Sequence, residues 1–505
     1  MLRSPRLFVI MASPLKKLAG QTAIYGFSSI LGRLLNYALT PLYTSAHVFT
    51  TDQYGIITEM YSYVAFLVVL LMYGMETGFF RFYSNSNQKT VVYSTAIWSL
   101  AFSTFAFIAL ISLFSGPISS ALGYPNHQEY IIWFAIIVGL DALIAIPLAR
   151  LRAENKPIRF ALINFSFIGV NIGLNLFFLW YCLPEYQSGN ANWLIDTFYN
   201  PEIGVGYVFI SNLIASVVRF VMVFPDLGKI RVVFDAVVWK NMMRYCAPLL
   251  VVGLAGIINE TLDKPLLKWL LIPALGEEEV MSQVGIYGGV YKLSIAITLF
   301  VQAYRYAAEP FFFDQKDRSE SKATYAKMLH WFTGFVLFAF LVITLYIDVF
   351  KHFLQSEAYW EALDIVPVLI LANVCLGIYY NLSVWYKLTD KTIYGSYMAV
   401  MGAVITISLN LILIPKIGFR GAAYTTLICY ASMAVVSFLV GQKHYHVPYS
   451  VPKIATFFGL ALLLFTIDRL VTINSIWMAY SLKALLIAMF VSSVYFVEQK
   501  SSYTQ

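Results

Sequence analysis

Long apolar runs recur along the whole chain of 505 residues. A helix needs roughly 20 apolar residues to cross about 30 Å of bilayer hydrocarbon. Only 12% of the residues are charged, about half the usual fraction in a soluble domain. The sequence therefore predicts an all-α polytopic membrane protein with about 14 transmembrane helices, near residues 18–42, 56–80, 91–114, 130–149, 160–183, 203–224, 246–271, 284–310, 330–350, 363–386, 393–414, 421–441, 453–468 and 475–496.

The segments between these runs are too short to hold a further domain. The two longest polar gaps, Pro184–Ile203 and Phe313–Leu329, fall far below the roughly 50 residues of an independent fold. A nucleotide-binding domain, a glycosyltransferase domain and a large extracytoplasmic loop are therefore excluded. Residues 1–17 contain an apolar run too short for a signal peptide, so we expect a cytoplasmic tail whose true start is Met1 or Met11.

Lysine and arginine concentrate in every second connecting segment, and such residues stay on the cytoplasmic side of a membrane. The asymmetry predicts an even number of spans with both termini in the cytoplasm. The segment with Lys416 and Arg420 runs against it. This topology, with attraction to anionic lipid headgroups, accounts for the net charge of +7, so that no nucleic-acid partner is implied.

Two sets of matching residues indicate an internal repeat of six spans. Gly55 pairs with Gly285 at the entry of the second and eighth spans, and Asn175 pairs with Asn410 in the fifth and eleventh. Because six is even, the two halves would share one orientation and be related by a pseudo-two-fold axis along the membrane normal. We therefore expect a solute path between two six-helix lobes, and this organisation: a tail at 1–17, lobes at 18–228 and 229–442, and two extra helices with a cytoplasmic tail at 443–505.

Ionisable side chains inside the spans are the most informative residues, since each costs roughly 3 kcal/mol in hydrocarbon and usually faces a cavity. Basic groups there would attract an anionic substrate, because arginine matches phosphate oxygens with paired hydrogen bonds. The predicted substrate-binding residues are Arg33, Asn36, Arg81, Arg219, Lys292 and Arg305. The carboxylates predicted to serve in coupling or in ion pairs are Glu76, Asp141, Asp263 and Glu309.

Several of these residues have a second interpretation. Arg33 could extend towards the membrane surface, and Arg81 could be a topology anchor. Asp263 is the repeat partner of Arg33, which makes an ion pair across the halves plausible, but Asp263 could equally pair with Lys268.

No cofactor or metal site is predicted. The four cysteines, Cys182, Cys246, Cys375 and Cys429, lie in or beside apolar runs and show no metal-binding spacing. The histidines are scattered over the expected interfaces. His444 and His446 form a close pair, but such a pair at an interface is usually incidental.

Two stretches carry a resemblance to a known family. LKKLAGQTAIYGFSSILGRLLNYALTPLYT and the following DQYGIITEMYSYVAFLVVLLMYGMETGFFRF resemble the polysaccharide-type flippases of the multidrug/oligosaccharidyl-lipid/polysaccharide (MOP) exporter superfamily. The likeness extends more loosely through the six-plus-six repeat. The lipid II flippase branch of that superfamily also has fourteen spans, whereas many glycan flippases have twelve.

The resemblance implies a transporter that moves undecaprenyl-diphosphate-linked oligosaccharide to the outer leaflet of a bacterial cytoplasmic membrane, for cell-surface polysaccharide biosynthesis. Members look like two lobes around a cationic cavity that opens alternately to each side. Arg33 matches by position, whereas Arg81, Lys292 and Arg305 fit the basic lining by depth only. The implied partners are the lipid-linked glycan, membrane lipids, and a glycan polymerase and glycosyltransferases of the same pathway.

Two other functions stay open. A cation-coupled multidrug exporter of the same superfamily would handle mostly cationic compounds, which ought to need acidic residues where the first span has Arg33. A polytopic membrane glycan polymerase, ligase or acyltransferase would need a positioned base or nucleophile. Since the outer loops are short, we expect a transporter and not an enzyme.

Overall fold

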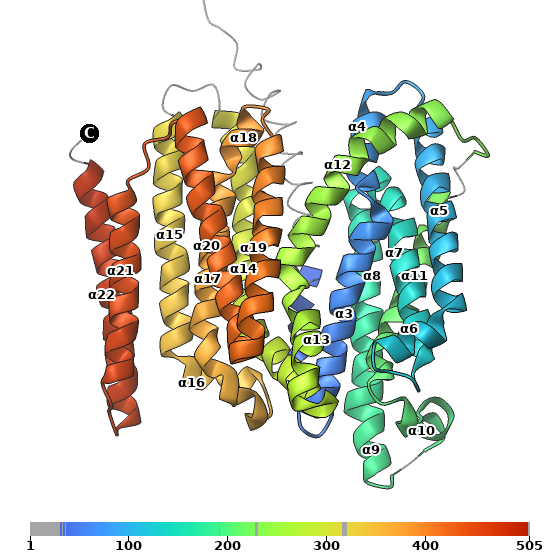
Figure 1. Ribbon diagram of the computed structural model, residues 1–505, viewed down its shortest axis with the longest axis horizontal. Helices are drawn as coiled ribbons and strands as arrows, with labels where there is room; N and C mark the ends of the chain where they lie inside the picture. The colour runs from blue at the N-terminus through green and yellow to red at the C-terminus, as the bar shows by residue number, and fades with distance from the viewer. Residues whose placement is uncertain are drawn as a thin grey trace, which may run out of the picture. The chain divides into compact units, whose positions relative to one another are not determined.

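The computed structural model describes residues 31–32, 34–35, 37–190, 192–227, 231–315 and 321–502. These residues are mainly helical, and no strand occurs among them. Thirteen helical segments within this part of the chain are long and apolar enough to cross a membrane (Figure 1). The predicted all-α polytopic fold is therefore confirmed, and the chain is a multi-pass membrane protein.

Contacts between residues divide the chain into two compact units. The first comprises the chain up to Leu42 together with Met60–Ile257, and the second comprises Tyr43–Glu59 together with Ile258–Gln505. The short helix α2 (Thr40–Tyr43) and the long helices α3 (Thr51–Met72) and α12 (Ala236–Thr261) contribute residues to both units. The lobe limits expected from the sequence stay a prediction.

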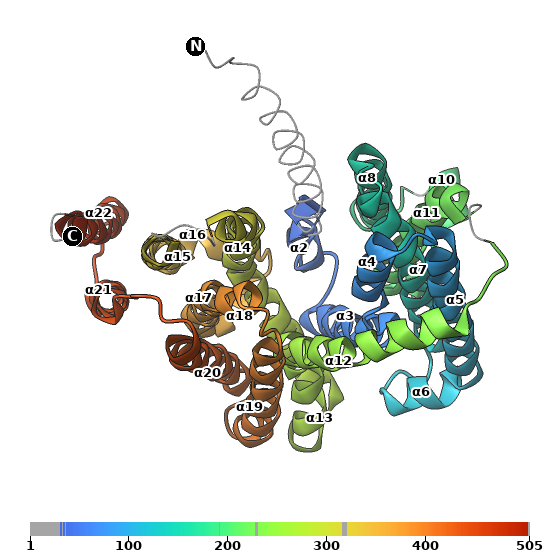
Figure 2. The ribbon, with the colours of Figure 1, turned by 90° about the horizontal axis from the view of Figure 1, so that it is seen from above.

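In the first unit, α7 (Gln128–Ala153) is the central helix. It is apolar on all sides, as a helix enclosed by other helices should be. It packs against α4 (Met75–Asn85), α5 (Lys89–Leu113), α8 (Pro157–Asn175) and α11 (Gly206–Leu227), which lie around it when seen from above (Figure 2). The shorter elements of this unit are α6 (Ser115–Ala121), the π-helix η1 (Leu176–Cys182), α9 (Leu183–Gln187), α10 (Trp193–Phe198) and η2 (Pro201–Ile203).

In the second unit, α17 (Val366–Leu382) packs closely against α20 (Phe419–His444). Around this pair lie α14 (Glu277–Gln315), α15 (Ser321–Leu345) and α19 (Ile393–Ile417). The last two helices of the chain pack against α15 and against each other. The remaining elements are α13 (Asp263–Leu275), α16 (Ile347–Phe350), η3 (Lys351–Phe353), η4 (Glu357–Ile365), α18 (Val384–Leu388), α21 (Val451–Leu470) and α22 (Ile476–Ser502).

The second to fourteenth predicted spans each overlap one of the thirteen apolar helical segments. Most of the first predicted span, 18–42, lies outside the described residues. The seventh span differs from the prediction of one run over 246–271, because α12 starts at Ala236 and ends at Thr261, and a separate helix, α13, starts at Asp263.

Two carboxylates explain this difference. Asp235 accepts hydrogen bonds from the backbone N–H groups of Val237 and Val238 at 2.8 and 3.0 Å, so it caps α12 well before the apolar run begins. Asp263 accepts a hydrogen bond from the Lys264 N–H at 3.0 Å in the first turn of α13. Pro265 lies in the same turn, where its missing N–H costs nothing. It therefore helps to start a new helix rather than kink a continuous one.

The repeat glycines Gly55 and Gly285 meet where α3 crosses α14, within the second unit. A side chain added at Gly55 would overlap the carbonyl group of Met281, and one added at Gly285 would overlap the carbonyl group of Thr51. The hydroxyl groups of Thr51 and Ser282 are hydrogen-bonded beside the crossing at 2.7 Å. Glycine is therefore required on both helices for their backbones to approach this closely.

The crossing has the symmetry of a contact between equivalent surfaces. Thr51 and Met281 are separated by 281 − 51 = 230 residues, the same separation as Gly55 and Gly285, 285 − 55 = 230. Exchanging the two helices therefore exchanges the two close contacts, as in an isologous interface. The glycine match that suggested a repeat thus marks a real contact between the matched helices.

We expect Gly55→Ala and Gly285→Ala each to lower the free energy of unfolding by about 1–3 kcal/mol, because the added methyl group must push two backbones apart. Gly256→Ala in α12 is the control, since no atom from elsewhere in the described part of the chain lies within 4 Å of a side chain added there. It should leave stability unchanged or raise it slightly. Thermal unfolding in detergent measures all three variants, and equal melting temperatures would contradict this account.

Candidate functional site

The predicted site residues fall into three groups. Arg33 and Asn36 lie outside the described residues, as does the side chain of Glu309. The other residues belong to different units, and each unit is considered by itself. The first unit holds Glu76, Arg81, Asp141 and Arg219, and the second holds Asp263, Lys292 and Arg305.

Asp263 is the centre of a buried polar cluster at the start of α13. One of its oxygens, Oδ1, accepts a hydrogen bond from the ammonium group of Lys264 at 3.0 Å, and the other, Oδ2, accepts one from the hydroxyl group of Tyr287 at 2.5 Å. The Lys264 ammonium also lies 4.4 Å from the ring centroid of Tyr291. Asp263 and Lys264 are both buried, so each charge is neutralised by the other.

Lys292 follows this cluster on α14, about 22 Å along the helix from its first residue. Within the described part of the chain its ammonium group forms no hydrogen bond or ion pair. Lys264 lies close enough to repel it. A cation in mid-span next to a like charge is costly, and an anionic ligand would remove that cost.

A second buried ion pair, not predicted from the sequence, links α13 to α3. The ammonium group of Lys268 lies 2.9 Å from Oε2 of Glu59, and the two side chains are 1% and 0% exposed. Asp263 thus pairs with Lys264, and Lys268 pairs with Glu59. The alternative that Asp263 pairs with Lys268 is therefore wrong. Glu59 lies inside the predicted span 56–80, where a charge is costly. Its position alone could therefore have identified Glu59 as a site residue.

We expect Lys268→Met and Glu59→Gln each to reduce the free energy of unfolding by about 3–5 kcal/mol, since either change leaves a buried polar or charged group uncompensated. The double variant Glu59→Gln/Lys268→Met should recover part of that loss, because no buried charge remains. Unfolding of the purified variants in detergent provides the measurement. A double variant whose loss equals the sum of the single losses would argue against the pair.

Arg305 opens onto a crevice between α14, α17 and α18 in the second unit. Its guanidinium group lies 4.8 Å from the ring centroid of Tyr380. The hydroxyl group of Tyr304 donates a hydrogen bond to Oδ1 of Asn381 at 2.7 Å. Cations, hydroxyl groups and an amide are the groups that phosphate and sugar hydroxyls bind, and here the polar lining comprises Tyr304, Arg305, Tyr380, Asn381, Ser383 and Lys387.

In the first unit, two of the predicted residues meet each other. The guanidinium group of Arg219 lies 3.5 Å from Oδ1 of Asp141 and donates a hydrogen bond to Oδ1 of Asn164 at 2.7 Å. It also lies 5.2 Å from the ring centroid of Phe167. Within this unit, the predicted binding group and the predicted coupling group therefore partly neutralise one another.

Glu76 and Arg81 are neighbours in sequence but bind different partners. Glu76 forms an ion pair with Arg152, and both side chains are one-third exposed. The guanidinium group of Arg81 is exposed and lies 4.3 Å from the ring centroid of Tyr245 on α12. Glu76 thus has a structural partner in this unit, whereas Arg81 stays accessible.

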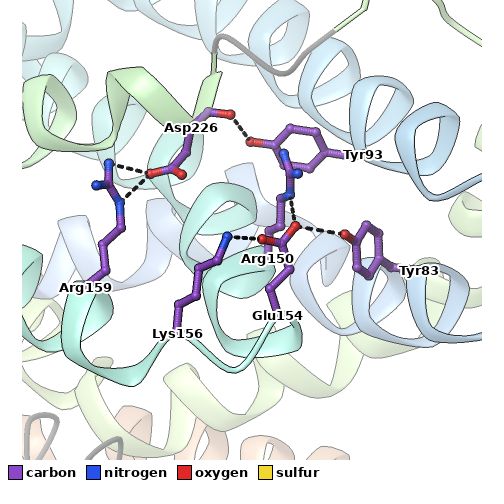
Figure 3. A network of polar contacts seen from close by, with 7 residues as sticks. All are labelled: Tyr83, Tyr93, Arg150, Glu154, Lys156, Arg159 and Asp226. Carbon is purple, nitrogen blue, oxygen red and sulfur yellow. Dashed lines mark hydrogen bonds and ion pairs between the residues drawn. The ribbon is translucent and has the colours of Figure 1, made fainter.

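A polar network surrounds the end of α7, as Figure 3 shows. Glu154 accepts hydrogen bonds from Arg150 at 2.5 Å, from Lys156 at 2.5 Å and from the hydroxyl group of Tyr83 at 3.2 Å. Burial raises the pKa of the Glu154 carboxyl group, but the hydrogen bonds from Lys156 and Arg150 outweigh it and hold the pKa at about 2. The carboxylate is thus the anchor of these two basic residues.

The same network joins α8 to α11. The guanidinium group of Arg159 lies 2.9 Å from Oδ2 of Asp226. The hydroxyl group of Tyr93 donates a hydrogen bond to the backbone carbonyl group of Asp226 at 3.1 Å. Three of the basic residues at this end therefore have carboxylate partners within the described structure, which is typical of groups that stabilise a helix end.

The low pKa of Glu154 predicts a pH-dependent loss of stability. A carboxyl group whose pKa is lower in the folded than in the unfolded state stabilises the fold above its ordinary pKa of 4.5, and this stabilisation is lost as the pH falls towards about 2. We expect Glu154→Gln to lower stability at neutral pH and to flatten this part of the stability profile. Unfolding curves between neutral and acidic pH would show it, and identical profiles for the variant and the native protein would refute it.

Within the described residues, no group of three His, Cys, Asp or Glu side chains could hold a metal ion. All four cysteines are free thiols, and three are buried. Cys246 packs into the apolar cluster that includes Met75 and Phe79.

Comparison with solved structures identifies similar folds over nearly the whole chain. The lipid II flippase MurJ, in an inward closed conformation, matches with a TM-score of 0.70 and 16% identity over 94% of this chain and 98% of its own. This chain and MurJ therefore share a fold. An inward-facing multidrug resistance MATE transporter of the MOP superfamily matches with a TM-score of 0.62 and 13% identity over 82% of this chain and 94% of its own.

A MATE protein in the straight conformation matches with a TM-score of 0.59 and 13% identity, over 85% of this chain and 96% of its own. No protein-family model matches the sequence, and no curated protein matches it. The fold predicted from the resemblance to MOP exporters is therefore confirmed. The similar structures are a flippase and transporters, not enzymes.

Proposed function

We propose that this protein is a flippase for undecaprenyl-diphosphate-linked oligosaccharide, which it moves from the cytoplasmic to the outer leaflet of a bacterial cytoplasmic membrane. The observation that carries the proposal is Lys292, a mid-span cation that pairs with no carboxylate in the described part of the chain. A diphosphate would bring a negative charge to this ammonium group. The match to MurJ over nearly its full length supports the proposal.

The basic groups of the second unit suit different parts of such a substrate. Because Asp263 neutralises Lys264, the charge of Lys292 is left to bind a phosphate group. Arg305 and its neighbours combine cations with aromatic, hydroxyl and amide groups, the kinds of group that bind phosphate and sugar hydroxyls. The prenyl chain would stay in lipid, where it costs no transfer of apolar surface into water.

Transport would proceed by alternating access. Asp263 is the candidate coupling group, because protonation of its carboxylate would weaken the bond to Lys264 and leave two adjacent cations. Arg33, Asn36 and Glu309 are proposed site residues on sequence grounds alone. The proposal also places both termini in the cytoplasm and assigns the protein to surface-polysaccharide synthesis, with glycosyltransferases and a polymerase as pathway partners.

A cation-coupled multidrug exporter is the second candidate, because MATE transporters share the fold. Such a protein should bind organic cations through carboxylates. In the second unit, the buried carboxylates Glu59 and Asp263 are already bound to lysines, which disfavours this function. Drug susceptibility of a deletion strain separates the two candidates, since an exporter would be needed for resistance and a glycan flippase for surface glycan.

The proposal is tested with proteoliposomes that contain a fluorescent undecaprenyl-diphosphate sugar. A membrane-impermeant quencher reports the fraction of lipid in the outer leaflet over time. We expect Lys292→Gln to slow translocation by about tenfold to a hundredfold, the equivalent of one charged hydrogen bond. Lys292→Arg should retain most of the rate, because it keeps the charge.

Lys416→Gln serves as the matched control, since Lys416 is exposed at the end of α19. It should translocate lipid at the native rate. A native rate for Lys292→Gln, with transport intact in the other two variants, would contradict a role for this cation in substrate binding.

A further inference from the structure

Residues Arg231–Tyr245, which include the first turns of α12, form a segment on the surface of the first unit that we call the α12 elbow. Its first residues are fixed to α5 through their backbone. The N–H group of Arg231 donates a hydrogen bond to the hydroxyl group of Ser94 at 3.0 Å, and that of Asp235 donates one to Thr95 at 3.1 Å. The elbow therefore has a defined position on α5.

Two tryptophans add to this attachment. The indole N–H of Trp98 donates a hydrogen bond to the carbonyl group of Arg231 at 3.2 Å, and that of Trp239 donates one to the hydroxyl group of Ser99 at 2.9 Å. Both rings stay partly exposed, at 43% and 37%. Tryptophan with a bonded N–H and an exposed ring is typical of the interface between membrane and water.

The inner face of α12 is already covered. Met242 and Cys246 are fully buried in the apolar cluster formed with α4 and α5, and Val238 packs against it. These positions follow the spacing of one helix face. What remains accessible on the elbow is therefore a separate face and not part of the core.

The accessible face carries large apolar side chains. Val232 is 93% exposed, Phe234 51% and Val237 70%. Val232 and Phe234 precede α12 and Val237 lies in its first turn, so all three come before the long apolar run that starts near residue 246. Exposed apolar side chains in such a short segment indicate contact with an apolar phase or a partner.

Basic residues alternate with these apolar side chains. Arg231, Lys240 and Arg244 are exposed, and none of them forms an ion pair within the described residues. The neighbouring carboxylates are engaged elsewhere: Glu154 and Asp226 bind other basic residues (Figure 3), and Asp235 caps α12. The elbow therefore presents three uncompensated positive charges beside its apolar groups.

We propose that the α12 elbow is a docking surface for anionic phospholipid headgroups of the leaflet at this end of the protein. The charges complement phosphate groups, while the valines, Phe234 and the tryptophan rings would enter the boundary between headgroups and acyl chains. This combination of apolar and basic groups on one short segment fits a lipid surface better than a soluble protein or a nucleic acid, which would leave the apolar side chains exposed.

The test uses the full-length protein in nanodiscs of phosphatidylcholine alone or mixed with phosphatidylglycerol. Native mass spectrometry after release from the nanodisc counts the phosphatidylglycerol molecules that remain bound. One basic residue at an anionic surface contributes about fivefold in affinity. We therefore expect Arg231→Gln/Lys240→Gln/Arg244→Gln to reduce retention by more than about tenfold.

Two triple variants serve as controls. Arg231→Lys/Lys240→Arg/Arg244→Lys keeps the charge and should retain phosphatidylglycerol like the native protein. Lys351→Gln/Lys416→Gln/Arg469→Gln removes the same charge from the ends of other helices and should also retain it. Melting temperatures in phosphatidylcholine alone check that all variants are folded, and a misfolded glutamine variant would be replaced by Lys240→Gln, with about a fivefold loss expected.

Native-like retention by the glutamine variant of the elbow would overturn the proposal. An equal loss in the variant with changes at other helix ends would also overturn it, because it would show a general effect of net charge. Binding that depends on the elbow but is equally strong for an acidic peptide would point to a protein partner and would contradict a lipid surface.

Discussion

Neutralisation of charge away from water is the constraint on which the second unit depends. Glu59 and Lys268 are almost completely inaccessible, and Asp263 and Lys264 are buried one helical turn away. An isolated charge in such surroundings would cost several kcal/mol, so each ion has to meet its partner for the helices to pack at all. The Glu59–Lys268 pair thereby fixes α13 against α3, and the hydrogen bond from Tyr287 to Asp263 joins α13 to α14.

Lys292 is an exception, because its ammonium group forms no ion pair within the described residues. This cation gives the site its affinity for an anion. The ammonium group of Lys264 lies over the ring of Tyr291 and pairs with Asp263, whereas Lys292, which Lys264 repels, has no such partner in the described structure. An ammonium group in mid-span without an ion pair among the described residues is the best candidate for contact with substrate. The α12 elbow shows the same contrast at the surface. Nearby carboxylates pair with some of the basic residues, whereas the basic residues of the elbow form no ion pair within the described residues.

The sequence predicts the spans well because length and hydrophobicity decide them almost alone. It places the seventh span incorrectly because Asp235, a single capping residue, starts α12 ten residues before the apolar run. It identifies Asp263, Asp141 and Arg219 as important, but it does not assign Lys264 as the partner of Asp263 or Asn164 as a partner of Arg219, because the direction of side chains on packed helices decides these contacts. The Glu59–Lys268 pair joins residues 209 positions apart, a distance over which local pattern carries no information.

The crossing of α3 and α14 restricts which residues the two helices can carry. At most positions, a substitution affects mainly the side chains around it. Gly55 and Gly285 are different, because each makes room for the main chain of the other helix. A larger residue at either position would move both backbones, so the two helices can shift here only together.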